Sequence, residues 1–258
     1  MPPGRLTRLL ALVAGALVSV AVVAGSLAGS HAAPGAPAGP FAETQTIAIP
    51  PPRPLRTDPH LVRWAPVNVA TVARSAPRAG APAVAKVARR TPEGTVDVVL
   101  VLGHSHVTPA GVWLRARLPG GRVGWLPRRT LGGYTVVTTR LVVDRRRLTA
   151  TLLRRGRRVF RAPVAVGRPG SPTPAGRFYV RVALRHYRSP MYGPLAFGTS
   201  ARAPGVTDWP AGGFVGVHGT DRPELIPGRV SHGCIRLRNA DVVRLGRLMT
   251  VGTPVTVR

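Results

Sequence analysis

Short runs of β-forming residues, separated by turn signals, recur through the second half of this chain. Residues 139–143 and 147–153 are rich in Val, Leu and Thr, and a charged turn at 144–146 lies between them. Another turn at 154–157 leads into a third run at 158–166. Short strands at regular spacing are typical of an all-β sandwich or barrel. This pattern predicts a mostly β fold, with a β-sandwich in the second half of the chain.

One stretch after these runs has helical spacing. Residues 240–249 place apolar side chains about one helical turn apart, and Asn239 is the expected N-cap. Gly252 should end this short C-terminal helix, and residues 253–258 should form a closing strand. By contrast, residues 187–213 are rich in Gly and Pro and poor in strand signals. We expect a long loop there, of the kind that often carries a binding surface.

The upstream region, residues 61–135, is also rich in β-forming residues. We expect strands at residues 67–72, 95–102, 112–118 and 123–127, with a hairpin turn at 119–122 between the last two. These features predict a small, separate β domain. His104 and His106 alternate within it and would face one side of a strand, but no third metal ligand accompanies them. An exposed turn is the favoured interpretation, and no metal or cofactor is predicted.

Residues 1–33 have the three parts of a secretory signal. Arginines precede an apolar run at residues 9–24, and small residues follow up to Ala33. An uncleaved membrane anchor is the alternative, although the run is only weakly hydrophobic and near the minimum length for a span. Residues 34–60, rich in Ala and Pro, should form an extended linker. We therefore expect an exported protein of the periplasm or cell wall, with no membrane span after cleavage.

Positive charge dominates the composition, and the formal net charge is +28. Such an excess often marks a nucleic-acid-binding protein. Here the predicted export argues against that function, as does the scatter of the arginines through the strands. We expect attraction to anionic wall polymers instead, and no nucleic-acid partner.

Cys234 is the only cysteine in the chain. An exported protein with one cysteine cannot form an intramolecular disulfide, so the thiol is either structural or reactive. It lies in the segment Ser231-His232-Gly233-Cys234-Ile235-Arg236, where small neighbours let other atoms approach the sulfur. His218 lies upstream in the sequence. A cysteine with a separate histidine meets the minimum requirement for an imidazole-activated nucleophile.

At His218-Gly219-Thr220, and at the cysteine segment continued to Leu237 and Asn239, the chain resembles the L,D-transpeptidase (YkuD-type) catalytic domain family. The resemblance extends over residues 138–258. It implies a peptidoglycan L,D-transpeptidase in which Cys234 forms an acyl-enzyme with a stem peptide. It also implies that His218 is the base, that the Gly219 carbonyl fixes its tautomer, and that carbapenem-type β-lactams are inhibitors. Separately, residues 113–131 resemble the end of a bacterial SH3-like barrel, which implies an SH3-like domain at 61–135.

Other residues have expected roles in the same site. His232, two residues before the cysteine, is the rival for the base, because on an extended loop it would project to the same side as Cys234. The resemblance gives His232 a supporting place in the cleft instead. Asp221 is an alternative partner that could orient His218. The backbone N–H groups of Gly233 and Cys234 are the expected oxyanion donors. The expected substrate-binding residues are Ser231, Arg236, Tyr192 and Trp209. Tyr192 and Trp209 could equally pack within the loop. Arg236 and Arg229 could attract a carboxylate of the stem peptide or merely face solvent. Ser231 could hydrogen-bond within the loop.

Two other functions stay open at this point. The same Cys–His site could hydrolyse a stem peptide and release its terminal D-residue, as an L,D-carboxypeptidase does. The chain could also be a non-catalytic cell-wall-binding protein, although a binding module has no need of a lone thiol flanked by Ser, His and Gly. Neither paired carboxylates nor a cluster of metal ligands points to a glycosidase or a zinc hydrolase.

Overall fold

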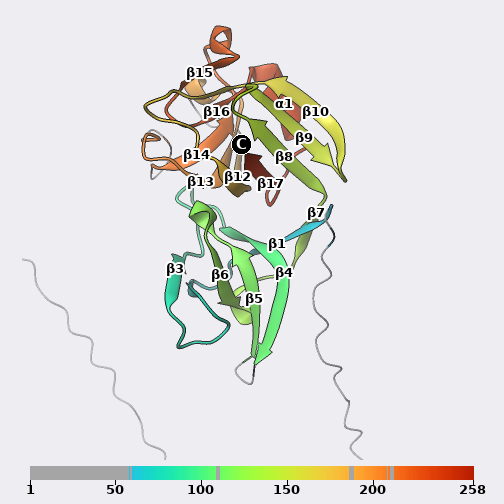
Figure 1. Cartoon of the computed structure of the whole chain (residues 1–258), viewed down its shortest axis with the longest axis vertical. Helices are drawn as coiled ribbons and strands as arrows, with labels where there is room; N and C mark the ends of the chain where they lie inside the picture. Colours follow the sequence, from blue (N-terminus) through green and yellow to red (C-terminus); the bar gives the residue numbers. More distant parts are fainter. Residues whose placement is uncertain (1–57, 59, 109–110, 186–188, 208, 210–211) are drawn as a thin grey trace, which may run out of the picture. The chain divides into compact units, whose positions relative to one another are not determined.

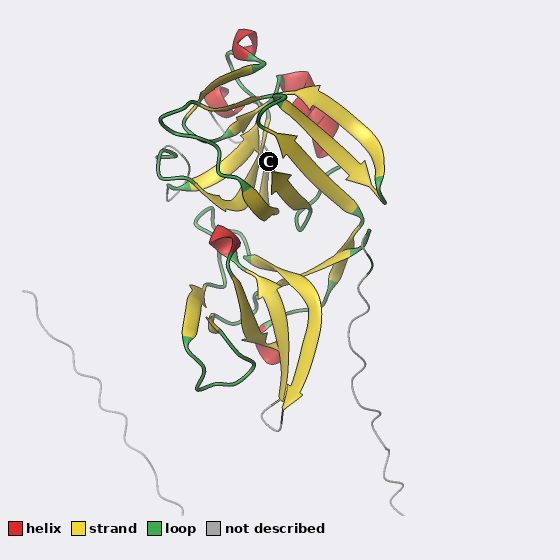
Figure 2. Cartoon of the chain, viewed as in Figure 1, coloured by secondary structure: helices red, strands yellow, loops and turns green. Residues whose placement is uncertain are grey.

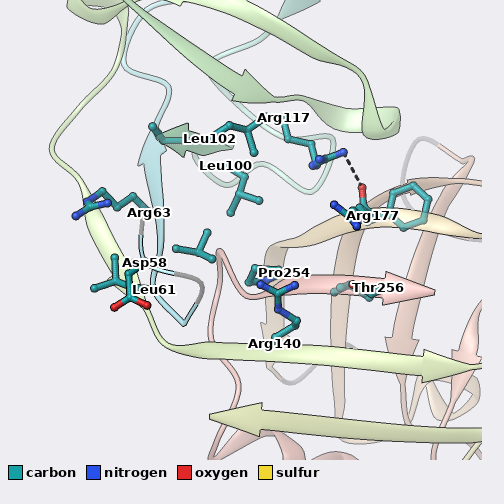
Figure 3. A pocket seen from close by; sticks show the side chains of 14 residues that line it. Asp58, Leu61, Arg63, Leu100, Leu102, Arg117, Arg140, Arg177, Pro254 and Thr256 are labelled. Carbon is teal, nitrogen blue, oxygen red and sulfur yellow. Dashed lines mark hydrogen bonds between the residues drawn. The ribbon is translucent and has the colours of Figure 1, made fainter. Parts of the chain in front are cut away.

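The structure is a computed structural model that describes residues 58, 60–108, 111–185, 189–207, 209 and 212–258. The predicted secretory signal at 1–33 lies outside the described residues, as does the predicted linker apart from Asp58 and His60. In the described ranges, no helix is both long enough and apolar enough to cross a membrane. Strands dominate the secondary structure, and a short helix lies near the C-terminus (Figure 2). The predicted mostly β fold with one short C-terminal helix is therefore confirmed.

The upstream region forms a seven-stranded antiparallel sheet with the order β3-β2-β6-β5-β4-β1-β7 (Figure 1). Its strands are β1 (Val62–Pro66), β2 (Thr71–Arg74), β3 (Ala83–Val87), β4 (Val98–Thr108), β5 (Gly111–Arg117), β6 (Val123–Pro127) and β7 (Thr135–Val137). The predicted hairpin is confirmed, since β5 and β6 pair antiparallel across a 3-10 turn at Pro119–Gly121. Leu114, Leu118 and Leu126 belong to the apolar core of this sheet. The more specific assignment as an SH3-like barrel stays a prediction.

Two details of the upstream sheet differ from the sequence prediction. The run at 67–72 is not one strand, because β1 ends at Pro66 and β2 begins at Thr71. The turn expected around His104 and His106 is also wrong, since β4 continues to Thr108 and His106 pairs with Trp113 of β5. The backbone hydrogen bonds of this long hairpin therefore decide the conformation of the histidine segment.

The second sheet contains ten strands in the order β10-β9-β8-β17-β12-β13-β14-β16-β11-β15. They are β8 (Thr139–Asp144), β9 (Thr149–Arg154), β10 (Arg157–Pro163), β11 (Ala165–Gly167), β12 (Gly176–Arg185), β13 (Leu195–Arg202), β14 (Phe214–His218), β15 (Gly228–Ser231), β16 (Ile235–Arg236) and β17 (Pro254–Val257). The sheet is mixed, with parallel pairs at β8–β17, β14–β16 and β11–β15. The three strands and two turns predicted from residue 139 onward are confirmed as β8, β9 and β10.

Strand β12 joins the two halves of this sheet. Its first residues, 176–179, pair with β17, and residues 180–185 pair with β13. A strand that changes partners in this way lets the two halves share one core, as in a sandwich. Leu152 of β9 and Phe197 of β13 belong to the same buried cluster, so side chains from both halves fill this core.

Strand β13 corrects the prediction of a long loop at 187–213. Residues Leu195–Arg202 form a strand between β12 and β14, and each of them except Arg202 is buried. The segment contains Gly198 and Ser200 between apolar residues, so it lacks the alternation of a half-buried strand. Close packing explains the glycine, because a Cβ at position 198 would lie 2.6 Å from Val182 and 3.0 Å from the Trp209 ring.

The predicted helix is present as α1 (Asn239–Gly246), and it buries Val242 and Leu245. It ends three residues before the predicted end at 249. Asn239 is its first helical residue, whereas Arg238 occupies the N-cap position without a side-chain capping bond. The capping role predicted for Asn239 is therefore wrong.

Contacts between buried residues join the upstream sheet to the second sheet. Arg181 of β12 forms two hydrogen bonds to the Asp97 carboxylate, at 3.1 and 2.9 Å, and both side chains are buried. The Tyr179 hydroxyl donates to the Val98 carbonyl at 2.8 Å. Burial raises the pKa of Tyr179 well above its ordinary range, so the hydroxyl keeps the proton that it donates.

Candidate active site

Two neighbouring strands bring Cys234 and His218 to the same place. Strands β14 and β16 are parallel, and His218 is paired with Arg236. Cys234 directly precedes β16 and lies beside Gly216, whose N–H donates to the cysteine Sγ at 3.3 Å. Gly216 and His218 are two residues apart on one strand, so both face the same side of it. An N–H donor directed at the sulfur favours the thiolate over the thiol.

The His218 ring is held by the carbonyl that follows it in the chain. Nδ1 lies 2.6 Å from the Gly219 carbonyl oxygen. A carbonyl oxygen can only accept, so Nδ1 carries a proton, and in the neutral form of the ring the lone pair is on Nε2. The ring is 1% exposed, and Tyr192 packs on it with a centroid distance of 4.5 Å. These contacts fix both the orientation and the tautomer of the imidazole.

Asn239 also holds the turn after His218, which the sequence analysis did not predict. Its Oδ1 accepts a hydrogen bond from the Thr220 N–H at 2.9 Å. Gly219 and Gly193 surround this oxygen so closely that a Cβ at either position would collide with it. The side chain expected to cap α1 therefore ties the start of the helix to the end of β14.

Hydrogen bonds inside the loop shape the segment before Cys234. The Ser231 hydroxyl donates to the Cys234 carbonyl at 2.6 Å and accepts from the Gly233 N–H at 3.1 Å. Gly233 has a φ of 129°, a conformation that favours glycine. From a neighbouring segment, the Thr173 hydroxyl donates to the Gly233 carbonyl at 2.8 Å and accepts from the Gly167 N–H at 2.9 Å. The sulfur is thus carried by a closely bonded turn.

These bonds bear on the expected roles of two residues. Ser231 is 0% exposed, and its hydroxyl hydrogen-bonds within the loop. Of the two expected oxyanion donors, the Gly233 N–H is the one that already donates to Ser231. His232 is exposed, and its carbonyl accepts a hydrogen bond from the Ser171 hydroxyl.

Tyr192 and Trp209 are buried, at 3% and 1% exposure. Their rings form a T-shaped pair with a centroid distance of 5.4 Å. The Trp209 indole also lies against Gly198 and Gly216. Of the two interpretations left open by the sequence, this geometry favours packing behind His218 over lining a groove.

The expected charged residues lie at different positions around the motif. Arg236 is partly exposed on β16, and its Nε is buried without a hydrogen-bond partner among the described residues. Arg229 is exposed, and its guanidinium donates to the Arg145 carbonyl at 2.7 Å. Asp221 is also exposed. The Gly219 carbonyl accepts the hydrogen bond from His218 Nδ1, which is the role for which Asp221 was the alternative. Within the described ranges, no three His, Cys, Asp or Glu residues are grouped so that they could hold a metal.

Cys234, directly before β16, and His218, on the adjacent strand β14, together form a candidate cysteine–histidine site. Residues 138–257 match the family model of the L,D-transpeptidase catalytic domain, YkuD. The resemblance seen in the sequence is thereby confirmed for this segment.

Two curated relatives show the extent of the similarity. The putative L,D-transpeptidase YkuD of Bacillus subtilis is 34% identical over 109 residues, which are 42% of this chain and 59% of the relative. The putative L,D-transpeptidase YkuD of Bacillus licheniformis is 31% identical over 118 residues, which are 46% of this chain and 64% of the relative. The chain thus spans about three fifths of the length of these relatives.

Solved structures give a similar match. The NMR structure of the catalytic domain from the E. faecium L,D-transpeptidase is 27% identical, covers 46% of this chain and 96% of that chain, and has a TM-score of 0.36. The same kind of domain acylated by ertapenem is 28% identical, with coverages of 46% and 96% and a TM-score of 0.35. An L,D-transpeptidase from Mycobacterium smegmatis is 20% identical, with coverages of 74% and 99% and a TM-score of 0.37.

Proposed function

We propose that residues 138–258 catalyse L,D-transpeptidation of peptidoglycan stem peptides, with Cys234 as the nucleophile and His218 as the base. One observation carries this proposal. The sulfur receives an N–H from the strand that carries His218, and the Gly219 carbonyl keeps the proton of that ring on Nδ1. The reaction class, L,D-transpeptidation, is suggested by the similarity to putative L,D-transpeptidases.

The first half of the proposed reaction forms an acyl-enzyme. His218 Nε2 accepts the thiol proton, and the Cys234 sulfur attacks the carbonyl carbon that precedes the terminal D-residue. The carbon–nitrogen bond then breaks, His218 returns the proton to the leaving amine, and a thioester remains on the sulfur. The Cys234 N–H donates to the oxygen that carries negative charge during this step, a role typically worth about 3 kcal/mol of barrier.

The second half transfers the acyl group to an amine. The acceptor amine of a neighbouring stem, on diaminopimelate, attacks the thioester carbon and gives a proton to His218. The carbon–sulfur bond breaks, the sulfur takes that proton back, and a new amide forms the cross-link. Arg236, partly exposed beside the motif, would attract a carboxylate of a stem peptide, and His232 would support the cleft. The reaction needs no cofactor or metal.

This function requires export, which we propose for the signal at residues 1–33, because peptidoglycan lies outside the cytoplasm. A carbapenem-type β-lactam would present a strained amide to the same sulfur and leave a covalent adduct on Cys234.

Product analysis with a synthetic tetrapeptide stem tests the proposal. With an added amine, we expect release of the terminal D-residue together with a new amide product. Release that leaves the amine unused would favour the L,D-carboxypeptidase alternative instead. If neither product forms and Cys234 reacts with an electrophile no faster than an ordinary thiol, the cell-wall-binding alternative gains support and the enzyme proposal is wrong.

The positive charge has a separate proposed role. We propose that the net positive charge attracts anionic wall polymers. None of the catalytic steps above depends on this attraction. Added salt should weaken such binding, because exposed charges are screened beyond about 8 Å at physiological ionic strength. Wall binding that does not respond to salt would contradict this role.

A further inference from the structure

Glu93, a residue of the upstream sheet region, contacts Trp209, which packs behind the His218 ring through Tyr192. Glu93 lies in the loop between β3 and β4, and its Oε1 accepts a hydrogen bond from the Trp209 indole N–H at 2.5 Å. Trp209 is 1% exposed, so water cannot easily replace this acceptor. A buried indole N–H is normally paired, and here the partner comes from outside the segment that matches the L,D-transpeptidase catalytic domain.

The indole links this hydrogen bond to both proposed reactive side chains. Its ring forms the T-shaped pair with Tyr192, and Tyr192 packs on the His218 ring. The indole also lies against Gly216, where a Cβ would be only 2.7 Å from its ring carbon Cζ3. Gly216 is the residue whose N–H donates to the Cys234 sulfur. A shift of the indole would therefore disturb the ring that packs on His218 and the strand position that contacts the sulfur.

The loop that carries Glu93 is itself well fixed. The Thr91 N–H donates to the Thr95 carbonyl at 2.8 Å, and the Gly94 N–H donates to the Thr91 carbonyl at 2.9 Å. Asp97, at the end of the loop, makes the buried ion pair with Arg181. The carboxylate of Glu93 is thus presented from a rigid support, which suits a group that holds another side chain in place.

We propose that Glu93 is a positioning residue for His218 and acts through Trp209 and Tyr192. The proposal rests on the proposed function, in which His218 activates Cys234. It makes the upstream β region a part of the active unit and more than a spacer between the linker and the catalytic domain.

Alkylation of Cys234 by iodoacetamide measures the effect without any need for the natural substrate. Since Cys234 is the only cysteine, the rate reports this one thiol. Glu93→Ala should slow alkylation by roughly ten- to a hundredfold, the range expected when a catalytic group is displaced by about 1 Å. Glu93→Gln keeps an acceptor oxygen and should react close to the wild-type rate. Glu93→Asp keeps the charge but is too short, and should resemble Glu93→Ala.

A double-mutant cycle tests whether the effect passes through His218. In a His218→Ala background, Glu93→Ala should cause no further loss. Tyr179→Phe is the matched control, because it removes a different contact between the two sheets and should leave the alkylation rate unchanged in either background.

Three results would overturn the inference. Equal alkylation rates in Glu93→Asp, Glu93→Gln and the wild type would contradict the role of Glu93. If His218→Ala is slow in the same experiment, the proposed function stays intact. An equal loss from Glu93→Ala with and without His218 would show a general structural effect. A wild-type rate in His218→Ala itself would contradict both this inference and the proposed pairing of His218 with Cys234.

Discussion

At the scale of single residues, His218 shows how a carbonyl can replace a carboxylate as the partner of a histidine. The hydrogen bond from Nδ1 to the Gly219 carbonyl fixes the ring and its tautomer. It does so without placing a full negative charge beside the ring, as an aspartate would. Few acidic residues are present in this chain, and at His218 none is needed.

Thr173 offers a test of how the cysteine loop is held. Thr173 is 1% exposed, and its hydroxyl donates to the Gly233 carbonyl and accepts from the Gly167 N–H. Thr173→Val keeps the shape but leaves two buried polar groups unpaired, so we expect a loss of about 2 kcal/mol in the free energy of unfolding. Thr173→Ser keeps the hydroxyl and should lose clearly less. Urea denaturation measures both, and an equal loss in the two variants would contradict the role of the hydroxyl.

Gly216 tests the close packing around the sulfur and the imidazole. A Cβ at this position would lie 2.7 Å from the Trp209 ring and 3.3 Å from His218 Cδ2. Gly216→Ala should therefore displace the rings and slow acylation of Cys234 by ertapenem by about a hundredfold. Gly133→Ala, where a Cβ meets nothing within 4 Å, is the control and should keep the wild-type rate. Normal acylation in Gly216→Ala would mean that the ring positions are not critical.

At the scale of secondary-structure elements, helix α1 contributes to the site through its first residue. Asn239→Ala removes the acceptor for the Thr220 N–H, in the turn directly after His218 and Gly219. We expect a loss of about 1 kcal/mol in stability and about a tenfold slower acylation by ertapenem. Asn239→Asp keeps an acceptor oxygen and should retain most of the rate. If both variants acylate like the wild type, α1 does not help to position His218.

Elements with regular local patterns were predictable from the sequence. The strands β8, β9 and β10 have clear turn signals between them, and the β5–β6 hairpin has Pro-Gly-Gly at its turn. Strand β13 was missed because it is buried on both faces and contains glycine and serine, so it has no alternating pattern. Gly198 is required because a Cβ there would crowd Val182 and the Trp209 ring. These contacts form only when the chain folds, so no local sequence pattern reveals them.

The candidate site was predictable only in part, for a similar reason. A lone cysteine and an upstream histidine stand out in the sequence, and the structure places the histidine on β14 and the cysteine directly before the adjacent strand β16. The roles of Ser231, Asn239 and Trp209 depend on which backbone groups and rings reach them after folding. No local spacing encodes those contacts. The sequence alone therefore could not decide whether Ser231 bonds within the loop, whether Asn239 caps the helix, or whether Trp209 lines a groove.

At the scale of the whole described region, the buried ion pair between Asp97 and Arg181 joins the two sheets. Both side chains are at most 5% exposed. Asp97→Ala would leave the Arg181 guanidinium buried and unpaired, so we expect a loss of about 3–5 kcal/mol in the free energy of unfolding. Glu224→Ala is the control, because its pair with Arg222 is mostly exposed and should contribute no more than about 1 kcal/mol. Similar losses in both variants would contradict a structural role for the buried pair.

The whole account depends on the sulfur of Cys234 acting as a nucleophile that His218 activates. Intact-mass analysis of the full-length protein after brief mixing with a tetrapeptide stem tests this most directly. We expect an adduct equal to the stem peptide without its terminal D-residue in the wild type, a much slower adduct in His218→Ala, and none in Cys234→Ala. An adduct that persists in Cys234→Ala, or that forms at the wild-type rate in His218→Ala, would contradict the account.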